Sequence, residues 1–262
     1  MSGEPVLFAH SGSIARITLN RPAEGNAIDM KMAHGLAAVA LRCETDTSIR
    51  CVVLSGLGRL FCVGGDLRLF NDAGPQISRV LSELAGTLHD ALTHFARMQK
   101  PLLTLVNGPA AGAGLSLCLL GDVVLAVRSA HFTCAYTGIG LTPDGGMTWM
   151  LPRLVGVRRA QEMLLTNRRI EASEAARIGL ITRMVDDESL AEEGAKLASS
   201  LAQSATRALG ATRLLILESL SSSFETQLAR EARSIAAAGA NDESAEGIAA
   251  FVSKRIPNFN GA

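Results

Sequence analysis

The chain has 262 residues, 48% of them apolar, and 25 basic side chains balance 25 acidic ones. This length accommodates one large α/β domain, or a main domain with a small appendage. The zero net charge excludes a long-range field that would favour nucleic acid or an anionic membrane, so a ligand must be recognised by local groups.

Short runs of β-branched and apolar residues that end near Gly or Asn predict strands at 15–20, 50–56, 101–108 and 122–127. Helical spacing fills the intervals between them, notably at 29–43 and 76–99. Alternating strands and helices favour an α/β layered fold with near-parallel strands. After about residue 157 helical patterns dominate, with LITRMV as the one strand-like run, so the last third is predicted to be a helical subdomain.

Features of an exported or membrane protein are missing from the sequence. The start, MSGEPVLFAH, lacks a basic segment followed by an apolar stretch, and Asp122 interrupts the apolar run at 115–127. We therefore expect a cytoplasmic protein without a membrane partner.

Five cysteines without CxxC spacing indicate buried, reduced thiols, and the histidines form no recognised metal-ligand motif, so no metal site is expected.

Two glycine-containing turns each follow a predicted strand and precede a helix. They are LFCVGGDLRLF at 60–70 and NGPAAGAGLSL at 107–117. The first amides of a helix have no intrahelical acceptor, so two such turns on neighbouring strands would aim free N–H groups at one oxygen, as an oxyanion hole requires. Taken singly, each turn is more often a structural junction. Leu117 replaces the third glycine of a dinucleotide fingerprint, which argues against a nicotinamide site.

Several separated motifs occur together in one order and spacing. They are NRPAEGNAID, FCVGGDL, NGPAAGAG, GDVVLAVRSAHF, GLTPDGG, LPRLVGVRRAQEMLLT and EAARIGLI. From about residue 13 to the closing FVSKRIPNF, the chain resembles the enoyl-CoA hydratase/isomerase (crotonase) superfamily. The resemblance implies a crotonase-like ββα superhelix over 1–200, and a C-terminal helical region at 201–262 that covers coenzyme A and forms a trimer or a dimer of trimers. It also implies an acyl-CoA thioester as substrate and no separate cofactor, since coenzyme A belongs to the substrate.

The resemblance also assigns roles to individual residues. The amides of Gly65 and Ala113 would hold the thioester oxygen. Binding of the substrate and its coenzyme A would involve Ala27, Val63, Asp66, Gly112, Gly114, Tyr136, Phe251 and Lys254. In many members the last two positions reach coenzyme A from a neighbouring subunit, although Lys254 has the alternative of an ordinary solvated lysine.

The acid–base group is the most informative difference within the superfamily. Hydratases offer two glutamates, and the aligned positions here hold Ser116 and Tyr136. Asp144, in GLTPDGG, matches the lone aspartate of the dienoyl-CoA isomerase and ring-1,2-epoxyphenylacetyl-CoA isomerase branch. One carboxylate suffices to take a proton from one carbon and return it to another. We therefore expect an enoyl-CoA isomerase of fatty or aromatic acid degradation, with a helix cap as the structural alternative for Asp144.

The sequence is also compatible with other reactions. A hydratase would add water to a 2-enoyl-CoA with Asp144 and an unusual second group. An aryl-CoA dehalogenase-like hydrolase would use Asp144, with His89 as the residue that activates water. Tyr136 would then stand at the position where the dehalogenase of this superfamily has a tryptophan. A lone histidine without a sequence partner is weak evidence for such a base. The chain is also compatible with a non-catalytic acyl-CoA-binding member of the fold.

Overall fold

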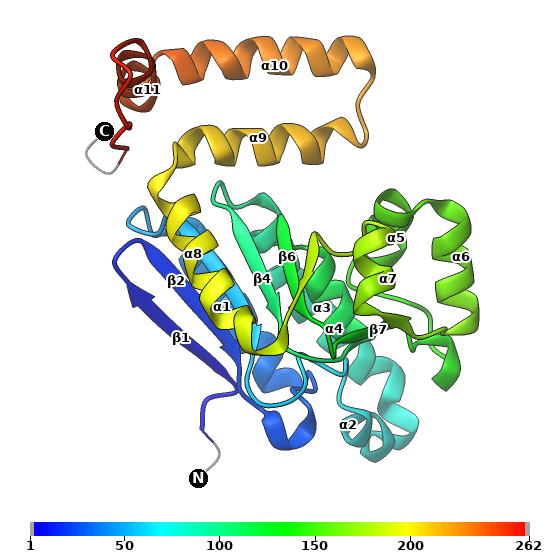
Figure 1. The fold of residues 1–262 in the computed structure, drawn as a ribbon. Helices are drawn as coiled ribbons and strands as arrows, with labels where there is room; N and C mark the ends of the chain where they lie inside the picture. The colour runs from blue at the N-terminus through cyan, green and yellow to red at the C-terminus, as the bar shows by residue number, and fades with distance from the viewer. Residues whose placement is uncertain (1–2, 260–262) are drawn as a thin grey trace.

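The computed structural model describes residues 3–259 and contains an α/β core that carries a C-terminal group of helices (Figure 1). The main sheet has six strands in the order β1-β2-β3-β4-β6-β9. Their bounds are Val6–Ser11, Ile14–Leu19, Cys51–Gly56, Leu102–Val106, Val123–Val127 and Arg183–Val185. The strands expected from the sequence are confirmed, as is the parallel pairing from β2 to β9.

β1 was not predicted, and it pairs antiparallel with β2 through the turn at Gly12. Its alternating burial is that of an edge strand with one wet face, and its mixed sequence, VLFAHS, carries a weak strand signal. A smaller sheet, also unpredicted, joins β5 (Ala110–Ala111), β7 (His131–Thr133) and β8 (Ile170–Glu171). Strands this short are hard to recognise from the sequence pattern.

Helices cover the main sheet and build the C-terminal third. The first seven are α1 (Met30–Thr45), α2 (Leu67–Asp72), α3 (Ile77–Arg97), α4 (Ala113–Leu119), α5 (Met147–Val155), α6 (Val157–Thr166) and α7 (Ala172–Arg177). The last four are α8 (Leu190–Gln203), α9 (Thr206–Ser219), α10 (Phe224–Gly239) and α11 (Asp242–Val252). α1 packs on α3, and α8 packs on β3, β4 and β6.

The five cysteines are buried free thiols. Within residues 3–259, every helix is too short or too polar to cross a lipid bilayer.

α9, α10 and α11 extend beyond the sheet as an arm, and α10 buries none of its residues (Figure 1). The buried carboxylate of Glu243, in α11, accepts a hydrogen bond from the Arg207 N–H in the first turn of α9 (3.0 Å). Glu243 also pairs with Arg50 (3.6 Å), whose guanidinium donates to the Ala202 and Ser204 carbonyls. A carboxylate at a helix N-terminus is favoured by the helix dipole. Polar contacts as well as packing therefore attach the arm to the core.

Asn26 fixes the segment between β2 and α1. Its backbone has a positive φ of 57°, and its side chain is fully buried. The side-chain nitrogen donates to the carbonyls of Leu57, Leu60 and Phe61 (2.8–3.0 Å), and the side-chain oxygen accepts the Arg21 N–H (2.8 Å). One amide thus holds the segment after β2 against the segment after β3.

We expect Asn26→Ala to lower the free energy of unfolding by about 2–4 kcal/mol, because it leaves several backbone groups without their partner. Urea unfolding at matched protein concentration measures this difference. Asn71→Ala is the control, since the exposed Asp72 carboxylate is the one described hydrogen-bond partner of the Asn71 side chain. Equal unfolding free energies for the two variants would contradict the assignment.

Candidate active site

Three chain segments lie side by side beyond the carboxyl ends of β2, β3 and β4. The Ile28 N–H donates to the Gly64 carbonyl (2.7 Å), and the Asp66 N–H donates back to the Ile28 carbonyl (3.0 Å). On the other side, the Ala111 N–H donates to the Cys62 carbonyl (2.9 Å). The segment that contains Gly64 and Gly65 is therefore held between the other two, which brings the two predicted glycine turns together.

The glycines are required where these turns meet. Gly64 has a φ of +102° and Gly112 a φ of +51°, which L side chains rarely adopt. A Cβ atom on Gly64 would lie 3.3 Å from the Ala113 nitrogen, and one on Gly114 would lie 2.2 Å from the Cys62 carbonyl oxygen. Side chains at these positions would push the turns apart.

Two backbone amides are left free by this arrangement. Within residues 3–259, the N–H groups of Gly65 and Ala113 donate to no protein acceptor, because Gly64 and Asp66 make the hydrogen bonds to Ile28 and Ala113 begins α4. Both residues line a cavity of about 370 Å³. The site thus offers two neighbouring donors to an oxygen atom of a ligand.

The wall of this cavity is mostly apolar. Its side chains come from the turns, from α2 and α3, and from the 135–144 segment, and they include Leu67, Phe70, Leu81, Leu84, Leu88, Ile139 and Leu141. Asp144 is the only carboxylate among the described lining residues, and none of them is Lys, Arg or His. Asp144 is therefore the one side chain in the wall that is equipped to take a proton near neutral pH.

Two hydroxyl groups donate hydrogen bonds to Asp144. The Tyr136 hydroxyl donates to Asp144 Oδ1 (2.5 Å), and Ser116 Oγ donates to the Asp144 backbone carbonyl (3.0 Å). Burial, together with the nearby Asp144 charge, raises the pKa of Tyr136 far above its ordinary value of 10.0. Tyr136 therefore stays protonated and remains a hydrogen-bond donor to the carboxylate.

His89, from α3, approaches Asp144 from the other side. Its Nε2 accepts a hydrogen bond from the Gly145 N–H (3.1 Å) and lies 3.5 Å from Asp144 Oδ2. The histidine does not line the first cavity. It lines a second cavity of about 420 Å³ between α3, α5 and α9, together with Gly145 and Trp149. The Asp144–Gly145 peptide thus lies where the two cavities adjoin.

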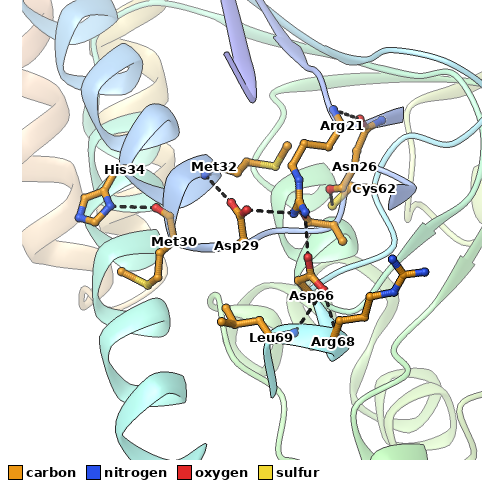
Figure 2. A network of polar contacts seen from close by, with 11 residues as sticks. Arg21, Asn26, Asp29, Met30, Met32, His34, Cys62, Asp66, Arg68 and Leu69 are labelled. Atoms are coloured by element: carbon orange, nitrogen blue, oxygen red, sulfur yellow. Dashed lines mark hydrogen bonds and ion pairs between the residues drawn. The ribbon is translucent and has the colours of Figure 1, made fainter. Parts of the chain in front are cut away.

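Arg21 joins the segment that contains Ile28 to the segment that contains Gly64 and Gly65 (Figure 2). Its guanidinium donates to the Ala27 carbonyl (2.6 Å) and to Asp66 Oδ2 (2.9 Å), and lies 3.4 Å from Asp29 Oδ2. The other oxygen of Asp66 accepts the Arg68 N–H (3.1 Å) and so caps α2. Arg21 therefore fixes the residues on both sides of the Ile28–Gly65 bridge.

Apart from His89, which lines the second cavity, the sequence-predicted residues fall into three groups in space. Those that line the first cavity are Val63, Gly65, Gly112, Ala113, Tyr136 and Asp144. Those that support it are Ala27 and Asp66, bound to Arg21, with Ser116 against Asp144 and Gly114 against Cys62. Phe251 and Lys254 belong to the end of the arm, at the opposite end of the molecule from α2 (Figure 1), and Phe251 is 85% exposed. One chain does not bring these last two to the cavity.

Known proteins match this chain over nearly its whole length. The Enoyl-CoA hydratase/isomerase family matches residues 9–262. The chain belongs to the enoyl-CoA hydratase/isomerase family. A putative enoyl-CoA hydratase/isomerase from Mycobacterium abscessus superposes with a TM-score of 0.92 at 32% identity, over 98% of this chain and 100% of that one. The crotonase-like fold is confirmed.

Relatives in the enoyl-CoA hydratase/isomerase family carry different reaction names. The 1,2-epoxyphenylacetyl-CoA isomerase of Escherichia coli (strain K12) is 38% identical over 95% of each chain. A probable enoyl-CoA hydratase of Rhodobacter capsulatus is 40% identical over 100% of each. The 4-chlorobenzoyl coenzyme A dehalogenase-2 of an Arthrobacter species is 33% identical over 97% of this chain and 93% of that one. These matches show the family, and the reactions that their names give differ from one relative to the next.

Sequence reasoning missed Arg21 and the contact between His89 and Gly145. Arg21 stands in the quoted motif NRPAEGNAID, and a basic residue close to two acidic ones is a weak signal that many surface segments share. The His89 contact joins residues 56 positions apart in the chain, so no local pattern reports it. Within the described residues, no group of three His, Cys, Asp or Glu side chains is placed to hold a metal ion.

We expect Arg21→Met to lower the free energy of unfolding by about 1–3 kcal/mol, since it leaves the Asp66 carboxylate without its cation. Burial raises the pKa of Asp66, but the hydrogen bond from Arg21 and the amides of α2 outweigh it and hold that pKa below its ordinary value of 3.8. A lowered carboxyl pKa contributes stability above the ordinary pKa and loses it as pH falls through the folded-state pKa.

The difference in unfolding free energy between wild type and Arg21→Met should therefore be largest at neutral pH. It should decrease at acidic pH, below the ordinary pKa range of an aspartate. Urea unfolding over this pH range measures it. Arg68→Met, which removes an exposed neighbouring cation but no described side-chain contact, is the control. A difference that stayed constant down to acidic pH would show that Asp66 is not the partner that matters.

Proposed function

We propose that the protein is an enoyl-CoA isomerase that shifts a double bond along the acyl chain, in the degradation of fatty or aromatic acids. The observation that carries the proposal is the single carboxylate, Asp144, in a cavity that also contains the free amides of Gly65 and Ala113. A family relative with an isomerase name supports the same reading.

In the proposed mechanism, the thioester oxygen lies between the two amides. Their hydrogen bonds stabilise the negative charge that develops on that oxygen when a proton leaves the adjacent carbon. The Asp144 carboxylate takes this proton from C2 of a 3-enoyl-CoA, and the electron pair moves to form the dienolate. Asp144 then returns a proton to C4, which gives the 2-enoyl-CoA and restores the carboxylate.

Isomerisation is favoured over hydration because the described residues of the lining include no second acid–base group. The two positions where hydratases carry glutamates hold Ser116 and Tyr136, and both hydroxyls are used to bind Asp144. Addition of water needs a base for the water and an acid for the α-carbon. Tyr136, with its raised pKa, is a poor acid or base near neutral pH.

We expect Asp144→Asn to lower turnover of a 3-enoyl-CoA by about 10³-fold or more, because the amide cannot accept the proton. Binding of a CoA thioester should persist, since the two amides are backbone groups. Turnover is followed by ultraviolet absorbance of the conjugated product, and binding by calorimetry. Thr142→Val, which alters the cavity lining without removing a carboxylate, is the control. Near wild-type turnover by Asp144→Asn would exclude the mechanism.

A hydrolytic aryl-CoA reaction is the second candidate, favoured by the 3.5 Å distance between His89 Nε2 and Asp144 Oδ2. In that reaction Asp144 would attack a ring carbon, the halide would leave, and His89 would activate the water that hydrolyses the resulting ester. Against it, Nε2 already accepts the Gly145 N–H. Mass spectrometry of products from 3-enoyl-, 2-enoyl- and halogenated aryl-CoA distinguishes an unchanged mass, an added water, and exchange of halide for hydroxyl.

The proposal includes a trimer or a dimer of trimers in which residues 201–262 of one copy cover the coenzyme A bound to another. Large apolar side chains on the arm are exposed, among them Phe224 (73%), Ile235 (75%) and Phe251 (85%), and a second copy would bury such a surface. Phe251 and Lys254, remote from the cavity of their own chain, would then contact the coenzyme A of the neighbour.

We expect Lys254→Ala to raise KM for an acyl-CoA several-fold, by roughly 1 kcal/mol for one solvated ion pair, with kcat little changed. Lys196→Ala is the control, since Lys196 pairs with Glu192 on the exposed face of α8. Steady-state kinetics at several ionic strengths measures the effect, and analytical ultracentrifugation determines the oligomer. A monomer in solution, or equal KM values for both variants, would contradict this arrangement.

A further inference from the structure

We propose that His89 is a positioning residue, which together with Ser116 holds the peptide unit between Asp144 and Gly145 and so sets the direction of the Asp144 carboxylate. This inference rests on the proposed function, in which that carboxylate moves the proton. It gives the histidine a role as a hydrogen-bond acceptor and not as an acid or a base.

The peptide unit after Asp144 is bound at both of its polar ends. Its carbonyl oxygen, which belongs to Asp144, accepts hydrogen bonds from Ser116 Oγ (3.0 Å) and from the Met147 N–H (3.2 Å). Its N–H, which belongs to Gly145, donates to His89 Nε2 (3.1 Å), its one described acceptor. Ser116 comes from α4 and His89 from α3, so side chains of two separate helices hold one peptide unit.

This peptide unit needs such contacts because the chain around it rotates easily. Gly145 and Gly146 follow Asp144 directly, and both have positive φ angles, of 62° and 75°. Glycine adopts positive and negative φ with similar ease, so rotation of the peptide unit meets little local resistance. A side chain at position 145 cannot supply the restraint, since a Cβ atom there would lie 2.8 Å from the Ser116 Cβ. The restraint must therefore come from neighbouring elements.

The orientation of the peptide unit decides where the carboxylate points. Tyr136 donates to Asp144 Oδ1 at 2.5 Å and fixes that oxygen. With the side chain held at Oδ1 and the backbone held at the following peptide unit, the second oxygen, Oδ2, has a defined direction. Moving a proton between two carbons of the acyl chain depends on this direction, because a misplacement of about 1 Å can cost roughly 100-fold in rate.

The acceptor role of His89 also leaves Oδ2 of Asp144 free. Nε2 uses its lone pair to accept the Gly145 N–H, so the ring hydrogen is on Nδ1. Nε2 lies 3.5 Å from Oδ2, and without a hydrogen it donates nothing to that oxygen. A hydrogen-bond donor in the same place would bind the carboxylate and make it a weaker base. The position therefore requires an acceptor of the right reach.

Three substitutions at position 89 test the proposal with a 3-enoyl-CoA as substrate. His89→Leu removes the acceptor, and we expect kcat to fall about 10- to 100-fold with KM little changed. His89→Gln, whose amide oxygen reaches the place of Nε2, should recover most of kcat. His89→Asn carries the same amide on a side chain one carbon shorter, so it should behave like His89→Leu.

Hydrogen exchange of the Gly145 amide measures the contact itself, independently of turnover. The exchange rate, followed by nuclear magnetic resonance, should rise about fivefold or more in His89→Leu and His89→Asn, because one hydrogen bond is lost. It should stay near the wild-type rate in His89→Gln. Thr93→Val is the control and should match wild type in both measurements, since Thr93 lines the same second cavity and its hydroxyl donates to the His89 carbonyl within α3 (2.8 Å).

The inference is overturned by a kcat of His89→Leu equal to wild type, or by a loss that appears in KM alone. Equally low kcat values for His89→Leu and His89→Gln would also overturn it, because the ring and not an acceptor would then be required. An unchanged Gly145 exchange rate in His89→Leu would show that the contact restrains nothing. If wild type fails to isomerise any 3-enoyl-CoA, the proposed function is wrong, whereas the exchange rates still decide whether His89 holds the peptide unit.

Discussion

The close approach of two glycine turns is the constraint on which the rest of the site depends. Gly64 lies so near Ala113 that a side chain there would meet its backbone nitrogen at 3.3 Å, and this proximity places two free amides in one cavity. The approach is maintained from outside by Arg21, which binds the segments on both sides of the Ile28–Gly65 bridge. Backbone donors held by buried contacts keep their direction when a substrate binds, which is what electrostatic stabilisation of a developing charge requires.

The chemistry of such a scaffold is decided by a few side chains around the acyl chain. In this protein the Tyr136 hydroxyl donates to the Asp144 carboxylate and the Ser116 hydroxyl donates to the Asp144 backbone carbonyl, so both side chains help to position this one residue. From the side of the second cavity, His89 accepts a hydrogen bond from the N–H of Gly145, the residue after Asp144. A family whose relatives are named as isomerases, hydratases and dehalogenases is consistent with one pair of amides used by different acid–base groups.

The C-terminal arm is attached to the core through the Glu243–Arg50 pair and through Arg213 of α9, which pairs with Asp122, yet α10 buries none of its residues. Large apolar side chains remain exposed there, and a folded chain rarely leaves such a surface uncovered without a partner. Attachment through α9 and α11, with exposure along α10, suits a segment that completes a neighbouring copy. In that arrangement the core would supply the reacting groups and the arm of another chain would supply contacts to coenzyme A.

Local sequence patterns determined most strands and helices of the core, because buried parallel strands and amphipathic helices have strong periodicities. The short strands and β1 escaped because their signals are weak. The glycine turns were also predictable, since glycine is the residue that adopts a positive φ most readily. Asp144 was singled out by the resemblance of its motif to those of the family. Only the tertiary structure decided how these parts meet. Arg21 bound to Asp66, the Tyr136 hydroxyl on Oδ1, and His89 against Gly145 join residues from different elements, and contacts across such separations depend on how the chain packs and not on any local pattern.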